Sequence, residues 1–177
     1  VYRGEIIVNS SDEILIHSTT QSNNSQNFPV RNGFNNNFGG VQDAFFARFN
    51  SDASNLLSCS YIGGISYEAG NGLALSPNGD IYLCGGTSST TLGFNLAGQK
   101  NAYQGGTGDG FLLRISADGT QVLNGTYIGT TAYDQAYFVQ VDKRGNPFVT
   151  GQSAGVFDIT PPIYGNAEGG QFLELVA

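Results

Sequence analysis

The sequence lacks several residues on which catalytic and membrane-spanning proteins depend. It contains no methionine, no tryptophan, one histidine and only two cysteines among 177 residues. Asp, Glu, Lys and Arg together make up 12% of the chain, about half of the share in an average protein. No run of 18 apolar residues is present, although a membrane-spanning helix needs about that many. These absences argue against a helical membrane protein and against a structure built from charged, solvent-exposed helices.

The scarcity of histidine and cysteine also limits the chemistry. His17 has no second histidine and no cysteine cluster at metal-ligand spacing, so the sequence offers no zinc site. No serine lies in the Gly-x-Ser-x-Gly pattern of a hydrolase nucleophile. The glycine-rich stretch 105–110 lacks the lysine and the following helix of a phosphate-binding loop. We therefore predict a protein that is not an enzyme and that uses no metal and no cofactor.

The charge and the cysteines bear on partners and environment. Seven Lys and Arg against fourteen Asp and Glu give a net charge of -7 at pH 7, which repels phosphate backbones and anionic lipid headgroups. We expect neither nucleic acid as a partner nor direct membrane insertion. Cys59 and Cys84 are compatible with one disulfide, but we favour two buried free thiols.

What the sequence has in excess is glycine, with 26 residues, and an internal repeat. Residues 39–49 return as 105–115, and residues 60–64 return as 126–130, so the period is 66 residues. Units of this kind cannot bury their apolar faces alone and are stable only when stacked. We expect function to belong to the surface of the array.

Each unit carries the pattern of four strands joined by tight turns. In the second unit, Asn78-Gly79 and Asp118-Gly119 lie between strand-like apolar runs, which is a strong hairpin signal, and Gly145 follows in the third unit. Asp43 and Asp109 precede the third strand of successive units, where we expect them to accept backbone hydrogen bonds in a turn. The predicted strands are 5–9, 14–17, 45–49, 56–62, 72–76, 81–86, 111–115, 121–128, 138–142, 147–150 and 172–175.

This pattern predicts an all-β protein, namely a β-propeller of four-stranded antiparallel blades. The blades would be residues 1–66, residues 67–132 and a partial blade at residues 133–177, about two and two-thirds in all. Because the chain opens in one strand pattern and stops in another, we expect a segment of a larger propeller, with seven blades as one option. The remaining blades of the same chain would then be its nearest partners.

The repeat resembles the bacterial SBBP β-propeller family, whose units combine a Gly-Gly-x-x-Asp-Ala-Phe start with later Tyr-hydrophobic-Gly-Gly and Gly-Asn-x-Tyr-Val-x-Gly steps. The resemblance implies an exported protein at the bacterial cell surface or outside the cell, linked in some bacteria to type IX secretion, adhesion or gliding motility. It also implies a binding or scaffold role, with a protein, a surface glycan or the secretion machinery as partner. The matching residues are 39–45, 61–64, 78–82 and 144–151.

The long loops at 19–38 and 87–103 are the candidate binding surface. Amide side chains beside aromatic rings suit sugar or peptide recognition, although a polar loop pinned by buried phenylalanines is the interpretation we favour. Glu68 and Asp134 recur before the first strands of the second and third units, where they would rim a ligand surface or, as we favour, be solvated turn residues. The candidate loop residues are Asn23, Asn24, Phe34, Asn36, Phe94 and Asn95.

Three hypotheses about function follow. The first is a non-enzymatic propeller segment that binds a partner through its long loops. The second is a passive spacer or exported cargo handled by the secretion machinery. The third is a propeller hydrolase or lyase whose active site lies in missing blades. Asp43 and Asp109 as cation ligands remain an alternative to their role in turns.

Overall fold

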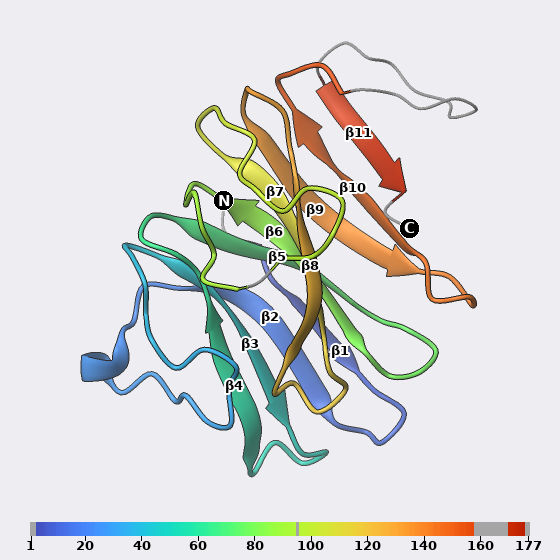
Figure 1. The fold of residues 1–177 in the computed structure, drawn as a ribbon. Coiled ribbons are helices and arrows are strands. Elements are labelled where there is room, and N and C mark those ends of the chain that lie inside the picture. Colours follow the sequence, from blue (N-terminus) through green and yellow to red (C-terminus); the bar gives the residue numbers. More distant parts are fainter. Residues whose placement is uncertain (1–2, 95, 158–169, 176–177) are drawn as a thin grey trace.

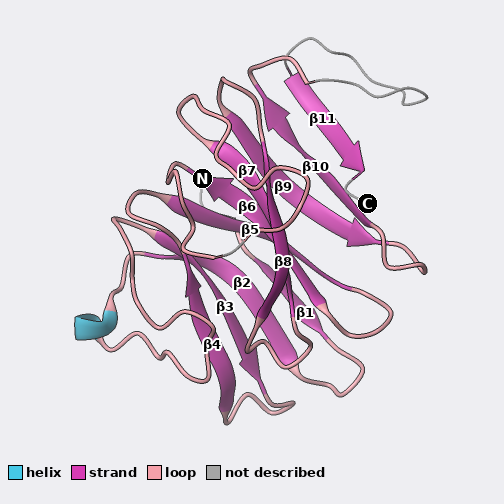
Figure 2. Ribbon diagram, in the orientation of Figure 1, coloured by secondary structure: helices cyan, strands magenta, loops and turns pink. Residues whose placement is uncertain are grey.

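The computed structural model describes residues 3–94, 96–157 and 170–175, and the regular secondary structure in this part of the chain is almost entirely β-strand (Figures 1 and 2). One short 3-10 helix, η1 (Asn24–Gln26), lies in the first long loop. The all-β prediction is confirmed. The strands are β1 (Glu5–Val8), β2 (Ile14–Thr20), β3 (Asp43–Phe49), β4 (Leu56–Ile62), β5 (Glu68–Leu75), β6 (Ile81–Thr87), β7 (Asp109–Ile115), β8 (Val122–Ile128), β9 (Asp134–Val141), β10 (Pro147–Ser153) and β11 (Gly170–Leu175).

The strands form three antiparallel sheets in chain order. The first has the order β1-β2-β3-β4, the second β5-β6-β7-β8, and the third, within the described residues, β9-β10-β11. Figure 1 shows the sheets one after another from the N-terminus to the C-terminus. Neighbouring strands are consecutive in sequence, so tight turns and short connections suffice to build each sheet.

The period of the sequence is reproduced in the strands. β7, β8, β9 and β10 each lie 66 residues after β3, β4, β5 and β6. The irregularities repeat as well, because β5 carries a bulge between Gly70 and Gly72 and β9 carries its bulge at the matching place. Matching positions in β5 and β6 lie 67 residues after those in β1 and β2, because the loop at 21–42 is one residue longer than the loop at 88–108.

Several strands begin earlier than the sequence predicted. β3 begins at Asp43 and β7 at Asp109, two residues before the predicted starts, and β5 begins at Glu68. These acids are the first residues of their strands, and their backbones pair with threonines of the neighbouring strands, as Asp43 does with Thr20. A buried carboxylate can begin a strand when backbone N–H groups solvate it.

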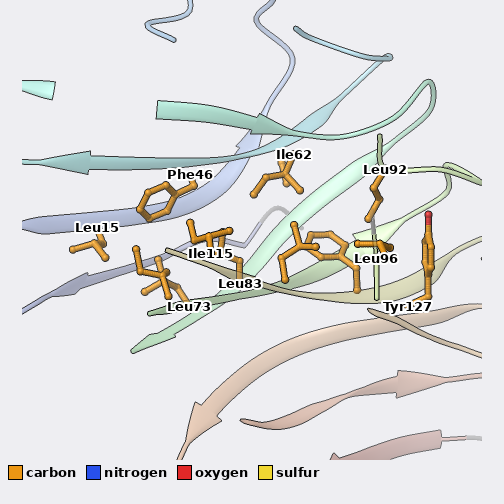
Figure 3. Close-up of a cluster of buried hydrophobic side chains, with 13 residues drawn as sticks. Leu15, Phe46, Ile62, Leu73, Leu83, Leu92, Leu96, Ile115 and Tyr127 are labelled. Atoms are coloured by element: carbon orange, nitrogen blue, oxygen red, sulfur yellow. The ribbon is translucent and has the colours of Figure 1, made fainter. Parts of the chain in front are cut away.

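Apolar side chains fill both spaces between the sheets. In the second sheet Leu113 points toward the first sheet and Leu112 toward the third, because successive side chains of a strand face opposite ways. Burying one such leucine contributes roughly 2 kcal/mol. Figure 3 shows the larger cluster, between the first and second sheets, which includes Leu15, Phe46, Ile62, Leu73, Leu83, Leu92, Leu96, Ile115 and Tyr127.

The turns follow the residues that the sequence marked. Gly79, Gly119 and Gly145 all have positive φ, at +90°, +73° and +91°, which glycine adopts without steric strain. The turn around Gly119 also joins two sheets, because the carbonyl of Asp118 accepts hydrogen bonds from Arg48 Nη1 and from Ser58 Oγ. The first turns of both units are fixed by ion pairs with the third strand, Arg48 with Glu13 and Arg114 with Asp80.

Candidate functional site: the loop surface

The long loop between the second and third strands of a sheet and the linker to the next sheet lie at the same end of the sheets. β2 and β4 both end there, followed by the long loop at 21–42 and by the linker to β5. The two segments pair directly, since Gln42 forms a parallel bridge with Tyr67, and Gly108 does the same with Tyr133 one unit later. This end of the molecule, with the loops 21–42 and 88–108, is called the loop surface below.

The long loops also cover the outer edge of their own sheets. Arg31 and Cys59 exchange two backbone hydrogen bonds, at 3.1 and 2.7 Å, and the amide of Tyr61 donates to Asn35. In the second unit the amide of Tyr127 donates to the carbonyl of Lys100. An uncovered edge strand is a template for aggregation. Sequence reasoning missed this role because the pairing residues share no motif between the two loops.

Aromatic side chains anchor the loops to the sheets. The Phe28 ring stacks on Tyr61 with centroids 4.6 Å apart, and Phe38 meets the same tyrosine edge-on at 5.6 Å. Phe34 of the first loop contacts Phe94 of the second at 5.5 Å. These contacts agree with the interpretation of polar loops pinned by phenylalanines, and the last one joins the loops of neighbouring units.

The predicted amides divide into structural and exposed groups. Asn23 is half-buried and caps η1 by accepting a hydrogen bond from the amide of Ser25. Asn24 is exposed, and its Nδ2 donates to the carbonyl of Asn36 at 2.9 Å. The side chains of Asn36 and, on the second loop, Asn101 are exposed and make no hydrogen bond to the described residues. Asn95 lies outside the described residues.

The interpretation of Glu68 and Asp134 as solvated turn residues is wrong. Each side chain is 1% exposed, and the two aspartates of the preceding third strands, Asp43 and Asp109, are fully buried. Sequence reasoning failed here because it took charge as a sign of exposure. The acids lie beneath the loop surface, so their carboxylates do not rim it.

The four acids form two equivalent pairs, one at each junction between sheets. Asp43 accepts a hydrogen bond from the amide of Gly39 at 2.9 Å, which is the geometry that a turn role requires, and Glu68 accepts one from the amide of Gly64 at 2.9 Å. The two carboxylates converge beside Gly63: a Cβ added there would lie 2.8 Å from Glu68 Oε2 and would clash with the carboxyl of Asp43.

The second pair repeats this arrangement. Asp109 accepts from the amide of Gln104 at 2.5 Å, Asp134 from the amide of Thr130 at 2.6 Å, and a Cβ on Gly129 would lie 2.5 Å from Asp109 Oδ1. Burial, followed by the charge of the paired acid, raises the pKa of Asp43 to about 6. Burial raises the pKa of Asp109 to about 7, with Asp134 adding to the shift.

His17 and the cysteines are structural. The buried ring of His17 spans the first two sheets, with Nδ1 2.9 Å from the carbonyl oxygen of Phe45 and Nε2 3.2 Å from that of Cys84. Burial lowers its pKa to about 4. Cys59 and Cys84 are free and buried, as we favoured, and burial raises the pKa of both thiols.

A hollow lies beside the second long loop, which contributes Gly98 and Gln99 to its lining. A cavity of about 230 Å³ lies between the second and third sheets, lined in part by Leu112, Arg114, Asn124 and Pro147. The matching space between the first and second sheets, beside Arg48, is filled by the turn at Asp118. The cavity between the second and third sheets therefore lies at the position that a hairpin turn occupies at the preceding junction.

Comparison with known proteins gives no assignment: no protein-family model matches the chain, and no curated protein matches it. Within residues 3–94, 96–157 and 170–175 there is no helix long and apolar enough to cross a membrane. The same part of the chain contains no group of three or more His, Cys, Asp or Glu side chains arranged to hold a metal ion.

Proposed function

We propose that the chain is a segment of a β-propeller of the SBBP type, in an exported bacterial cell-surface protein, and that it acts as a non-enzymatic binding or scaffold module. The proposed partner is a protein or a surface glycan in an adhesion or gliding role. The observation that carries the proposal is the loop surface, on which two successive units place their longest loops at one end and join them through Phe34 and Phe94.

The propeller arrangement is supported by the outer faces of the stack. On β1, Ile6 is 63% and Val8 59% exposed, whereas Leu73, which holds the position of Ile6 in the second unit, is 1% exposed. Phe138 on β9 of the third sheet is 49% exposed. Apolar faces of this kind mark interaction surfaces. In the proposed propeller, further blades cover both of them.

The exposed amides give the loop surface its capacity for recognition. Asn36, Asn37 and Asn101 each offer a donor and an acceptor to solvent, beside loops whose backbone is held by aromatic contacts. A surface that is already ordered loses little entropy when it binds. Polar, adaptable contacts on a fixed scaffold suit the hydroxyls of a glycan or the backbone of a peptide.

The test removes these amides without disturbing the fold. The variant Asn36→Ala/Asn37→Ala/Asn101→Ala lacks three side chains that hold no other part of the described structure together. The control is Gln121→Ala, an exposed amide at the opposite end of the second sheet. Binding of the purified chain to a glycan array and to whole bacterial cells is expected to fall at least tenfold in the triple variant and to be unchanged in the control.

The two other hypotheses give different results. A passive spacer or secretion cargo would show no binding in the wild type, or binding that the triple variant retains. A hydrolase or lyase with its active site in other blades would show turnover only in a longer chain. Either result would replace the proposed binding role.

A further inference from the structure

Three buried side-chain oxygens in the described residues have no hydrogen-bond partner, and all three belong to the acid pairs at the sheet junctions. They are Oδ1 of Asp43, of Asp109 and of Asp134. Buried polar atoms in folded proteins are almost always satisfied, so an orphaned one points to a missing ion, proton or water. That this happens at the same place in two successive units makes it a property of the repeat.

The remaining oxygens of the pairs are already used. At the first junction Glu68 accepts from the amide of Gly64 and from Thr87 Oγ1, while Asp43 Oδ2 accepts from Gly39. At the second junction Asp109 Oδ2 and Asp134 Oδ2 accept from backbone amides, the latter also from Thr130 Oγ1. The unused oxygens are therefore buried, without a donor, and next to a second carboxylate.

Positive charge near these pairs is sparse. At the second junction Lys100 lowers the pKa of Asp109, but its Nζ donates to the carbonyl of Gly129. At the first junction the nearby charge that acts on Asp43 is that of Glu68, which raises its pKa. Two adjacent buried carboxylates repel each other strongly in a low-dielectric interior unless a proton or a cation lies between them.

We propose that each acid pair, Asp43 with Glu68 and Asp109 with Asp134, binds a hard divalent cation of the Ca²⁺ class at the junction between sheets. Carboxylate oxygens are the ligands that such cations prefer, with backbone carbonyls and water completing the shell. Two carboxylates per ion correspond to a weak site, in the range of about 10⁻⁴ to 10⁻³ M typical of extracellular modules. The site lies beneath the loop surface, and its test uses no loop ligand.

Terbium luminescence is the direct probe. Tb³⁺ replaces Ca²⁺ in oxygen sites and emits when a nearby aromatic residue is excited, and this chain has tyrosine but no tryptophan. Tyr61 lies within the electrostatic influence of Asp43, as Tyr103 does for Asp109 and Asp134. We expect tyrosine-sensitised emission from the 177-residue protein, and we expect CaCl2 to displace it at millimolar concentration.

Thermal denaturation gives the second readout. At pH 7.5, 10 mM CaCl2 is expected to raise the midpoint of the wild-type chain by about 5 °C relative to EDTA. The nearly isosteric variant Asp43→Asn/Asp109→Asn is expected to lose both the terbium signal and the calcium shift. In EDTA its midpoint should equal or exceed that of the wild type, because the repulsion is gone. Asp12→Asn, which removes an exposed carboxylate, is the control.

Two outcomes would overturn the site. If CaCl2 leaves the wild-type midpoint unchanged, while lowering the pH from 7.5 to 6 raises it, each pair shares a proton instead of a metal ion. If the double variant keeps the terbium signal, the ion binds elsewhere. Should the double variant fail to fold, as judged by circular dichroism, the single variant Asp134→Asn gives the same test at the second junction.

Discussion

At the scale of single residues, His17 illustrates how burial sets chemistry. Both ring nitrogens face carbonyl oxygens, of Phe45 and Cys84, yet a neutral imidazole has one N–H to donate. Burial outweighs these two acceptors and keeps the ring neutral, with a pKa of about 4. The only histidine of the chain thus connects two sheets and is closed to solvent.

The first prediction follows from this pKa and from those of the buried aspartates. A group whose pKa is depressed in the folded state contributes stability above its unfolded pKa, and that stability is lost as the pH falls. His17 therefore destabilises the fold between about pH 6.5 and 4, whereas Asp43 and Asp109, with raised pKa values, stabilise it as the pH falls from about 7.

Urea denaturation in EDTA at pH 7 and pH 5 separates these effects. The free energy of unfolding of the wild type should hold or increase at pH 5, because the aspartates offset the histidine. In Asp43→Asn/Asp109→Asn, His17 is the only one of these three groups that still titrates. The free energy of unfolding of this variant should therefore fall by roughly 2 kcal/mol from pH 7 to pH 5. Equal stability of this variant at both pH values would mean that His17 is not held neutral by burial.

The second prediction concerns Gly63, whose missing Cβ makes room for the acid pair. The change Gly63→Ala forces the Asp43 carboxyl to move and to lose the hydrogen bond from Gly39, which should lower the free energy of unfolding by about 1–2 kcal/mol. In the background of Asp43→Ala the same change should have a smaller effect. A double-mutant cycle by urea denaturation measures this coupling, and additive effects would argue against the contact.

At the scale of elements, the strands were largely predictable and the loops were not. Alternation of side chains and the turns at Gly79, Gly119 and Gly145 locate the strands, because these signals are local. The burial of Glu68 and Asp134 has no such signal: their backbone donors, Gly64 and Thr130, lie only four residues earlier, but the burial itself depends on how the neighbouring sheets pack around them. The covering of β4 by the loop 21–42 likewise has no local signature in the sequence.

The third prediction tests that covering by hydrogen exchange. Cys59 and Tyr61 lie on the outermost strand of the first sheet, where the amides of an edge strand usually exchange quickly. Because they donate to Arg31 and Asn35, we expect them to be protected at least a hundredfold more than Asp52 in the adjacent turn. Exchange of all three amides at similar rates would show that the loop does not hold the edge in solution.

At the scale of the whole molecule, the 66-residue period was the most informative signal, because it identified the equivalent segments from the sequence alone. The stack of three sheets agrees with it, down to the matching bulges of β5 and β9. The acid pairs were visible as recurring residues, but their partnership across a junction follows only from how successive sheets are placed. Repetition predicts equivalence of positions, and packing decides what those positions do.

The fourth prediction is also the most direct test of the array. Ile6 and Val8 leave an apolar face open on the first sheet, so the chain of 18.7 kDa should associate through this face in solution. Light scattering coupled to size exclusion should give a mass above 18.7 kDa for the wild type, and 18.7 kDa for Ile6→Lys/Val8→Lys, both folded by circular dichroism. A folded wild type that remains a monomer at high micromolar concentration would contradict the view that its sheets belong to a larger stack.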